Sequence, residues 1–448
     1  MNRKIDKIIA EHFKNSRQAL LLTGARQVGK TYAFRKYAQK NKLQLIEMNF
    51  LLQPDTKNIV HGAKDIKDLL LRISAYSMQS LIPQKTILFF DEIQECPDIL
   101  TWVKAIVDNG TYICALSGSL FGVELNDIRS IPVGYMTERT MYPLDFEEFI
   151  RALGVTDEVI DKLHESWITH QEVDFYIHKR MLDLYNLYLI VGGMPAVVQK
   201  YLDTNDLQRV LAEQQAILNL YKRDIAKYDK NNKLYINDIF DLIPSELNSK
   251  NKRFILKNLN ENIKYSRFQN SFIWLRDADM ALPVYNAEEP KVPLKLNEQR
   301  SLFKLFQNDV GLLASQYVQG IQLQILQGNV DINFGAIYEN AVAQELHSHG
   351  WNLYYFNSKH QGEVDFLIEQ GDQIIPIEVK SGKDYQRHVA LNNLLNNDNY
   401  NINQAVVLCN GNVKKMDKII YAPIYMTMFI NYRQPTESII FHPQIPVL

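Results

Sequence analysis

Eight residues near the N-terminus form a pattern that suits the binding of a phosphate chain. The pattern G-x-x-x-x-G-K-[ST] is matched by Gly24, Ala25, Arg26, Gln27, Val28, Gly29, Lys30 and Thr31. The segment follows the apolar run ALLLT and precedes the helical pattern YAFRKYAQK. Its two glycines would let backbone N–H groups and a helix N-terminus point at phosphates. Lys30 would add positive charge at the β- and γ-phosphates, and Thr31 could ligate Mg²⁺.

Two adjacent carboxylates follow the apolar run TILFF, about 60 residues further along the chain. Such a run is typical of a buried parallel strand, and Asp91 and Glu92 stand at its end. Asp91 could hold Mg²⁺ through its shell, and Glu92 could polarise the attacking water. Ser117, at the end of the next apolar run, could sense the γ-phosphate, although a simple Ser-Gly turn explains it as well. Combined with the loop, these residues predict a nucleotide-hydrolysing site.

A second candidate site lies on a predicted β-hairpin near the C-terminus, formed by GEVDFLI and IIPIEVK around the turn QGD. With a period of two, Glu378 and Lys380 share one face of their strand, and the paired strand can bring Asp365 beside them. The carboxylates could hold Mg²⁺ or Mn²⁺, with Lys380 placed to orient or deprotonate water. Glu339, on the preceding predicted helix, could supply a further ligand.

The elements around these residues predict an α/β chain of four regions. Residues 1–155 alternate strands and helices, which favours a parallel sheet with helices on both faces. Residues 156–230 have a helical pattern, read as a lid or linker, and residues 231–330 combine short helices with a Pro-punctuated extended stretch that suggests a winged-helix-like domain. Residues 331–448 predict a second, smaller α/β domain. In the first region the expected strands are residues 19–23, 43–49, 86–90 and 111–116.

Composition narrows the class of protein. Of the 448 residues 46% are hydrophobic and 22% are charged, which excludes disordered and collagen-like chains. The 49 basic and 51 acidic residues give a net charge of -2, so no global positive field attracts nucleic acid or acidic membranes. A local surplus between residues 245 and 267 could contact DNA phosphates or form an ordinary solvated helix face. Its basic members are Lys250, Lys252, Arg253, Lys257, Lys264 and Arg267.

Cysteine usage and hydropathy predict a cytoplasmic protein. Cys96, Cys114 and Cys409 lie far apart in sequence and form no metal-binding or disulfide pattern. The N-terminus has no signal-peptide pattern, and no apolar run approaches the roughly 18 residues that span a bilayer.

The sequence resembles AAA-type ATPases, of the AAA+ superfamily of P-loop NTPases, that carry a C-terminal domain of unknown function. The resemblance rests on the segments LLTGARQVGKT, ILFFDEIQECP, LSGSL, IPVGYMTERTMYPLDFEEF, LYLIVGGMPAVVQKYL and WLRDADMALPVYNAEEPKVPLKLNEQRSLFKLFQNDVGLLA. It implies that ATP is bound by the glycines, lysine and threonine of the loop. It also implies that Asp91 and Glu92 form the second acidic motif and that Ser117 is the sensor.

One departure concerns the arginine finger. Similar proteins commonly have Gly followed by a basic residue shortly before the YPL segment, whereas this chain has Gly134 and Tyr135. Arg129 or Arg139 could replace the missing residue, but each is also explained as a solvated surface arginine.

The C-terminal D...ExK pattern resembles the PD-(D/E)XK nuclease superfamily, with Val364 where the proline of that name would stand. The resemblance implies a restriction-endonuclease-like α/β domain, which could cleave DNA or retain the fold without cleavage. We therefore expect an ATPase that uses ATP and Mg²⁺ and controls a nuclease-like domain. The alternative is an ATP-dependent switch whose C-terminal domain only binds DNA or protein. Candidate partners are DNA, another protein or a second copy of the chain.

Overall fold

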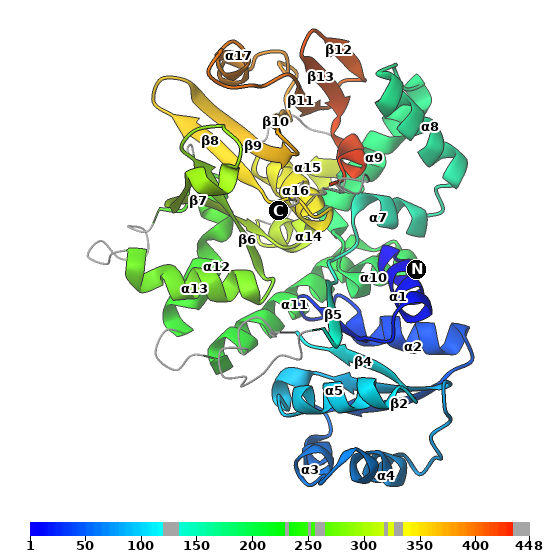
Figure 1. Ribbon diagram of the computed structural model, residues 1–448. Coiled ribbons are helices and arrows are strands. Elements are labelled where there is room, and N and C mark those ends of the chain that lie inside the picture. Colours follow the sequence, from blue (N-terminus) through cyan, green and yellow to red (C-terminus); the bar gives the residue numbers. More distant parts are fainter. Residues whose placement is uncertain are drawn as a thin grey trace, which may run out of the picture. The chain divides into compact units, whose positions relative to one another are not determined.

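The computed structural model describes residues 1–119, 134–228, 233–249, 252–255, 265–317, 321–326 and 335–432 (Figure 1). The chain divides into two compact units, each assembled from three separate stretches. Unit 1 comprises Met1–Thr156, Leu184–Pro283 and Leu305–Asn329. Unit 2 comprises Asp157–Asp183, Val284–Lys304 and Val330–Leu448.

Unit 1 contains a five-stranded sheet in the order β2-β3-β4-β1-β5. The described neighbours all pair in parallel, which confirms the parallel α/β sheet expected from the sequence. All residues of β1 and β3 are buried, because helices cover both faces of such a sheet. The strands are β1 Ala19–Thr23, β2 Gln44–Asn49, β3 Thr86–Asp91, β4 Ile113–Ser117 and β5 Met136–Thr140.

Helices surround this sheet, and apolar side chains fill the space between them. The Phe34 ring on α2 lies 5.0 Å from that of Phe89 on β3, and Phe50 stacks on Phe90 at 6.3 Å between centroids. The helices of this part are α1 Lys4–Asn15, α2 Lys30–Lys40, α3 Lys57–His61, α4 Ile66–Ser77, α5 Ile99–Asn109 and α7 Phe146–Ala152.

The rest of unit 1 is helical and joins the sheet part through a glycine contact. The Gly193 carbonyl accepts from Leu144 N at 2.7 Å, and Gly193 N donates to Asp309 Oδ2 at 2.6 Å. A Cβ on Gly193 would lie 2.0 Å from the Leu144 carbonyl oxygen, so only glycine permits this approach. The helices here are α10 Pro195–Thr204, α11 Leu207–Tyr228, α12 Lys233–Leu247, α13 Tyr265–Asp277, α14 Val310–Ala314 and α15 Ile321–Leu326.

Unit 2 is built on an eight-stranded mixed sheet in the order β12-β13-β11-β10-β9-β8-β6-β7. Strands β9 and β10 form the antiparallel hairpin predicted from the sequence, with Phe366 opposite Ile377. The strands are β6 Ala281–Ala287, β7 Glu298–Gln307, β8 Tyr354–Ser358, β9 Gly362–Gln370, β10 Gln373–Val379, β11 Ala405–Cys409, β12 Lys414–Met416 and β13 Ile419–Pro423.

This sheet corrects the expectation of a separate winged-helix-like domain in residues 231–330. The strands that would form its wing, β6 and β7, belong to the eight-stranded sheet, where β6 pairs in parallel with β8. The neighbouring helices α12 and α13 belong to unit 1 instead. Local patterning could not predict this, because the strand that pairs with β6 lies about 70 residues away in sequence.

The helices of unit 2 include α16, of which every residue from Ala336 to Leu346 is buried. Its polar residues Glu339, Asn340, Gln344 and Glu345 are therefore enclosed by the protein, where buried polar groups need partners. His178 on α9 has its Nδ1 2.9 Å from the Tyr425 hydroxyl. The helices are α8 Asp157–Thr169, the first part of α9 Phe175–Val191, α16 Gly335–Ser348 and α17 Val389–Leu395.

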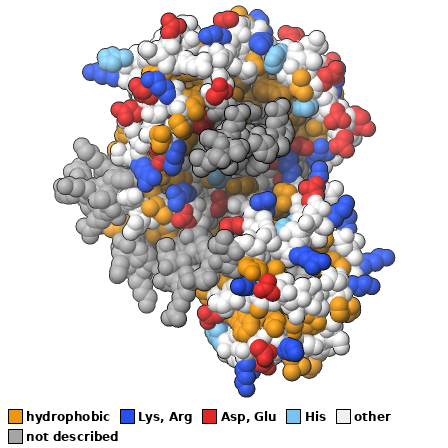
Figure 2. Space-filling model, in the orientation of Figure 1, with side chains coloured by type: hydrophobic (Ala, Val, Ile, Leu, Met, Phe, Trp, Pro, Cys, Tyr) orange, Lys and Arg blue, Asp and Glu red, His pale blue; other side chains and the backbone are white. Residues whose placement is uncertain are grey.

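Helix hydropathy and surface charge describe the environments that suit the protein. In the described part of the chain no single helix is long and apolar enough to cross a membrane, although the bent pair α9 and α10 meets that test by length and composition. On the face that Figure 2 shows, acidic and basic side chains are intermingled, in keeping with the balanced overall charge.

Candidate functional site

The predicted phosphate-binding loop connects β1 to α2, as the sequence pattern requires. Gly24 and Gly29 have φ values of 123° and 100°, in the region that favours glycine. A Cβ on Gly24 would lie 2.2 Å from the Met141 carbonyl oxygen, so the loop can pack there only with glycine. Because α2 begins at the end of this loop, its first N–H groups are available to an anion.

Lys30 folds back onto its own loop. Its Nζ donates to the carbonyl oxygens of Gly24 and Ala25, each at 2.8 Å, and its side chain is buried. Burial lowers the pKa of Lys30 to about 8, although Glu92 and Asp91 oppose this shift. The ammonium group therefore occupies a nest of carbonyl oxygens that a phosphate could replace as its partner.

Asp91 collects the groups expected of a magnesium site. Its Oδ2 accepts from Thr31 Oγ1 at 2.9 Å and from Asn49 Nδ2 at 2.8 Å, and its Oδ1 accepts from the Ser117 hydroxyl. Burial raises the pKa of Asp91, and the hydrogen bonds from Ser117 and Thr31 oppose the shift. The oxygen atoms of Thr31 and Asp91 suit Mg²⁺. This ion usually binds one or two protein oxygens, and phosphates and water supply its other ligands. Asn49 carried no recognisable signal in the sequence.

The carboxylate of Glu92 accepts hydrogen bonds from two neighbouring side chains. The residue has a positive φ of 55°, and its Oε2 accepts from Ser119 Oγ at 2.7 Å and from Gln94 Nε2 at 2.6 Å. The two serines of the segment LSGS thus contact different acids. Ser117 donates a hydrogen bond to Asp91, and Ser119 donates one to Glu92. Sequence reasoning singled out Ser117 and missed Gln94, which the neighbouring DEIQ segment could have suggested.

The helical part of unit 1 also touches the loop. Arg26 donates from Nη1 to Asp224 Oδ1 on α11 at 2.9 Å, and from Nε to Ser119 Oγ at 3.4 Å. The Tyr221 hydroxyl, also on α11, donates to the Arg26 carbonyl oxygen at 3.3 Å. Ala25 N donates to Asp279 Oδ2 at 3.3 Å, and burial raises the pKa of this aspartate to about 7.

Only one of the two candidate arginine fingers, Arg129 and Arg139, lies within the described residues. Arg129 lies outside the described residues. Arg139 is exposed on β5, and its guanidinium donates to the neighbouring Glu138 carbonyl oxygen at 3.1 Å.

The C-terminal candidate residues come together at the hairpin of unit 2. Asp365 on β9 accepts from Val379 N at 2.9 Å through Oδ2, and Lys380 Nζ lies 2.7 Å from Glu378 Oε1. Glu339, from α16, adds a third carboxylate that is 1% exposed.

A lysine that the sequence did not single out lies among these carboxylates. Lys304 on β7 is fully buried, and its Nζ lies 2.7 Å from Glu363, 3.4 Å from Glu339 and 3.7 Å from Asp365. The Nζ also lies 5.2 Å from the ring centroid of Tyr355. Burial by itself lowers the pKa of Lys304, but the three carboxylates outweigh it and raise that pKa well above its usual value.

Glu378 completes the cluster. Burial, followed by the charge of Asp365, raises the pKa of Glu378 to about 8, against the opposing effect of Lys380. Its Oε2 is buried and has no hydrogen-bond partner among the described residues. Each of the four carboxylates therefore has a lysine ammonium within 3.7 Å. Two lysine ammonium groups offset only part of the charge of these four carboxylates, and Lys304 lies among three of them.

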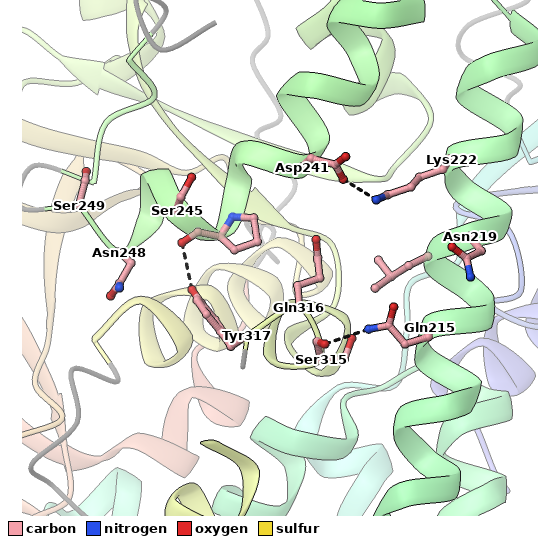
Figure 3. A pocket seen from close by; sticks show the side chains of 12 residues that line it. Gln215, Asn219, Lys222, Asp241, Ser245, Asn248, Ser249, Ser315, Gln316 and Tyr317 are labelled. Atoms are coloured by element: carbon pink, nitrogen blue, oxygen red, sulfur yellow. Dashed lines mark hydrogen bonds and ion pairs between the residues drawn. The ribbon is translucent and has the colours of Figure 1, made fainter. Parts of the chain in front are cut away.

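A polar cavity of about 700 Å³ lies elsewhere in unit 1, between α11, α12 and the segment after α14 (Figure 3). Its charges are paired, since Lys222 Nζ lies 2.7 Å from Asp241 Oδ1. The Tyr317 hydroxyl donates to the Pro244 carbonyl oxygen at 3.2 Å, which closes one side. The basic segment between residues 245 and 267, a possible DNA contact, lies close to this cavity in sequence. Its residues Lys250, Lys257 and Lys264 fall outside the described residues.

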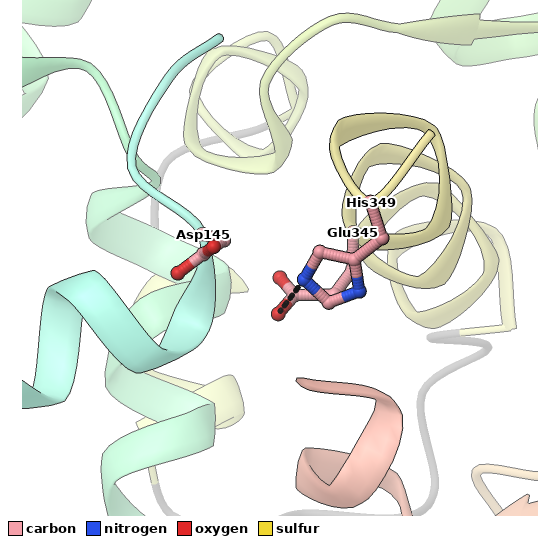
Figure 4. Close-up of side chains that lie close together, drawn as sticks. All are labelled: Asp145, Glu345 and His349. Atoms are coloured by element: carbon pink, nitrogen blue, oxygen red, sulfur yellow. Dashed lines mark ion pairs between the residues drawn. The ribbon is translucent and has the colours of Figure 1, made fainter. Parts of the chain in front are cut away.

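The histidines at the C-terminal end of α16 are explained by packing. His349, the residue after this helix, has its Nε2 3.6 Å from Glu345 Oε1, one turn earlier in the chain (Figure 4). Burial lowers the pKa of His347 to about 4, so this side chain is neutral at physiological pH.

Comparison with known families divides the chain into three segments. Residues 16–150 match the family model of an AAA domain. Residues 182–323 and 334–426 match two domains of unknown function, DUF8612 and DUF4143. No curated protein matches the chain. The N-terminal segment is therefore an AAA-type P-loop ATPase domain, and no nuclease family is among these matches.

Several solved structures are similar to parts of the chain. A Walker-type ATPase of Pyrococcus abyssi is 14% identical with a TM-score of 0.42, over 71% of this chain and 96% of that one. Cdc6p from Pyrobaculum aerophilum is 11% identical with a TM-score of 0.25, over 72% and 92%. A structure described as the basis for katanin self-assembly is 16% identical with a TM-score of 0.21, over 33% of this chain and 50% of that one. With TM-scores below 0.5, these likenesses carry no functional argument.

Proposed function

We propose that this protein binds ATP with Mg²⁺ at residues 24–31 and hydrolyses it with the help of Glu92. The observation that carries the proposal is the pair of linked contacts at the end of β3. Thr31 donates to Asp91 at 2.9 Å, while Ser119 fixes the adjacent Glu92 at 2.7 Å. The metal-binding side chains and the water-positioning carboxylate thus stand next to each other, beside a loop that offers N–H groups to phosphates.

Each group has a defined task in this proposal. Lys30 would exchange the loop carbonyls for phosphate oxygens, with which a lysine makes stronger charge-assisted hydrogen bonds. Thr31 and Asp91 would hold Mg²⁺, which neutralises negative charge on the β- and γ-phosphates when bound. Glu92 would accept a hydrogen bond from the attacking water, with its carboxylate oriented by Ser119 and Gln94.

The test is ATP turnover by the full chain and by Lys30→Ala, with Lys40→Ala as the matched control. Lys40 is an exposed lysine at the far end of α2, so its removal should leave turnover unchanged. We expect Lys30→Ala to lose both nucleotide binding and turnover. Turnover equal to that of the parent chain in Lys30→Ala would end the proposal.

For unit 2 we propose the non-cleaving alternative, a module that binds DNA or a protein partner under control of the ATP site. The observation that favours it is Lys304, whose buried ammonium lies within 3.7 Å of Glu339, Glu363 and Asp365 and offsets part of the charge that a divalent cation would meet. The competing hypothesis is metal-dependent DNA cleavage by Asp365, Glu378 and Lys380. We expect no cleavage of single- or double-stranded DNA with Mg²⁺ or Mn²⁺, with or without ATP. Cleavage that disappears in Asp365→Ala would establish the nuclease instead.

A salt series on DNA binding separates the two kinds of partner. A protein that contacts several phosphates loses affinity steeply as salt rises. DNA binding with such a slope would make DNA the ligand, and the lack of binding at low salt would point to a protein partner.

A further inference from the structure

We infer that Arg26 acts as an arginine finger within its own chain and that Asp224 on α11 holds it back in the resting state. The inference rests on the proposed ATP hydrolysis and concerns the regulation of that site. It assigns to the loop arginine the positive charge that phosphoryl-transfer enzymes bring to the γ-phosphate in the transition state. Regulation would then come from the helical part of unit 1 rather than from a partner molecule.

The position of Arg26 is the first argument. The residue lies inside the phosphate-binding loop, and its Nε is 3.4 Å from Ser119 Oγ. The same Oγ donates to Glu92 Oε2 at 2.7 Å. One hydroxyl therefore separates the guanidinium from the carboxylate that would position water. With ATP bound as proposed, a charge on this side of the site would lie near the γ-phosphate, where stabilisation of the transition state is most effective.

The second argument is the ion pair between Arg26 and Asp224. Nη1 lies 2.9 Å from Asp224 Oδ1, and the side chains are only 14% and 1% exposed. The other carboxylate oxygen of Asp224 is buried and has no hydrogen-bond partner among the described residues. The pair is thus a single-contact ion pair rather than a bidentate one. Phosphate oxygens offer a guanidinium the two-pronged geometry that it prefers, so ATP can compete for Arg26.

The third argument is that the restraint is connected to the rest of unit 1. Tyr221, one turn before Asp224 on α11, donates to the Arg26 carbonyl oxygen at 3.3 Å. Asn308 Nδ2 in turn lies 3.4 Å from the Tyr221 hydroxyl, next to the Asp309 that binds Gly193. A shift of α11 would therefore move both contacts of Arg26 together. This gives the helices a physical means of setting the rate of hydrolysis.

The experiment compares Arg26→Ala, Arg26→Lys and Asp224→Asn in the full chain. Arg35→Ala is the control, because Arg35 is an exposed arginine of α2 that pairs with Glu47. Turnover and the affinities for ATP and ADP are measured for each variant, and Lys30→Ala marks the background. We expect Arg26→Ala to lower kcat by about 10³-fold, the scale of a lost arginine finger, with ADP affinity nearly unchanged. Arg26→Lys should recover only a small part, and Asp224→Asn should raise kcat.

Two results would overturn the inference. One is a kcat in Arg26→Ala within twofold of the parent chain, and the other is an equal loss of ATP and ADP affinity, which marks a structural role. If the parent chain and Lys30→Ala turn over ATP equally slowly, the proposed hydrolysis fails. The inference is then judged by binding alone, and an unchanged ratio of ATP to ADP affinity in Arg26→Ala contradicts it.

Discussion

The two carboxylate sites of this protein use the same residue types in opposite ways. In unit 1 the acids at the end of β3 face hydroxyl and amide groups, and the nearby Lys30 binds carbonyl oxygens. In unit 2 the acids of the hairpin face Lys304 and Lys380 directly. The first arrangement leaves the charges of the carboxylates available to a cation and a water molecule, whereas in the second two ammonium groups already offset part of the charge of four acids. A lysine ammonium among the acids of a sheet edge therefore weakens the electrostatic attraction of that edge for a metal ion.

The largest expected effect tests the unit 1 side of this comparison. Glu92→Gln keeps the size of the side chain and its contacts with Ser119 and Gln94 but removes the charge that orients water. We expect kcat for ATP to fall by about 10²- to 10⁴-fold while ATP binding is retained. Turnover and nucleotide affinity measured on the same preparation check this. An unchanged kcat would assign the water-positioning role to another residue.

The next effect tests the unit 2 side. Lys304→Met removes the buried ammonium and leaves Glu339, Glu363 and Asp365 without their shared partner. We expect a loss of about 3 to 5 kcal/mol in the free energy of unfolding, measured by denaturant titration in the presence of a chelator. Lys380→Met is the control, because Lys380 is partly exposed and its ammonium contacts Glu378 rather than the three acids around Lys304.

The same variant can sharpen the comparison further. With its internal cation removed, the cluster should resemble a metal site, so Mn²⁺ should raise the melting temperature of Lys304→Met and not that of the parent chain. Equal stabilisation of both proteins by Mn²⁺ would show that the parent cluster already binds the metal.

A smaller effect concerns the orientation of Glu92. Ser119→Ala removes one of the two donors to its carboxylate, a charge-assisted hydrogen bond of about 1.5 to 3 kcal/mol. We expect a fall in kcat of about tenfold with KM for ATP unchanged, because the hydroxyl positions the catalytic carboxylate rather than ATP. A change confined to KM would place Ser119 in nucleotide binding instead.

The last test is a pH dependence in unit 2. The pKa of Glu378 is raised to about 8 in the folded protein, so the folded state holds a proton that the unfolded chain releases. Its stabilising contribution is therefore complete at acidic pH and is lost as the pH rises through about 8. Glu378→Gln stays neutral, so its stability relative to the parent chain should increase between about pH 5 and 8. A constant difference across that range would contradict the raised pKa.

Sequence patterns predicted the parts of the molecule that depend on neighbouring residues. The strand ALLLT and the loop that ends in Lys30 and Thr31 are continuous in sequence, and the structure has them as β1, a loop and α2. The hairpin of β9 and β10 was equally local, because a short turn sets its register. The expected winged-helix-like domain failed because β6 pairs with β8, and no local signal selects between a free hairpin and the edge of a larger sheet.

The contacts that decide the chemistry lie far apart in sequence. Arg26 and Asp224 are separated by 198 residues, and Lys304 reaches Glu363 from a strand that looks like an ordinary amphipathic segment. The sequence alone determined a P-loop, a strand with two terminal acids and an acidic hairpin, because hydrophobic periodicity and glycine conformation act over a few residues. Only the tertiary structure decided which positive charge meets which carboxylate. Such pairs form where the packing of distant elements brings side chains together, and their energies depend on burial that no local pattern records.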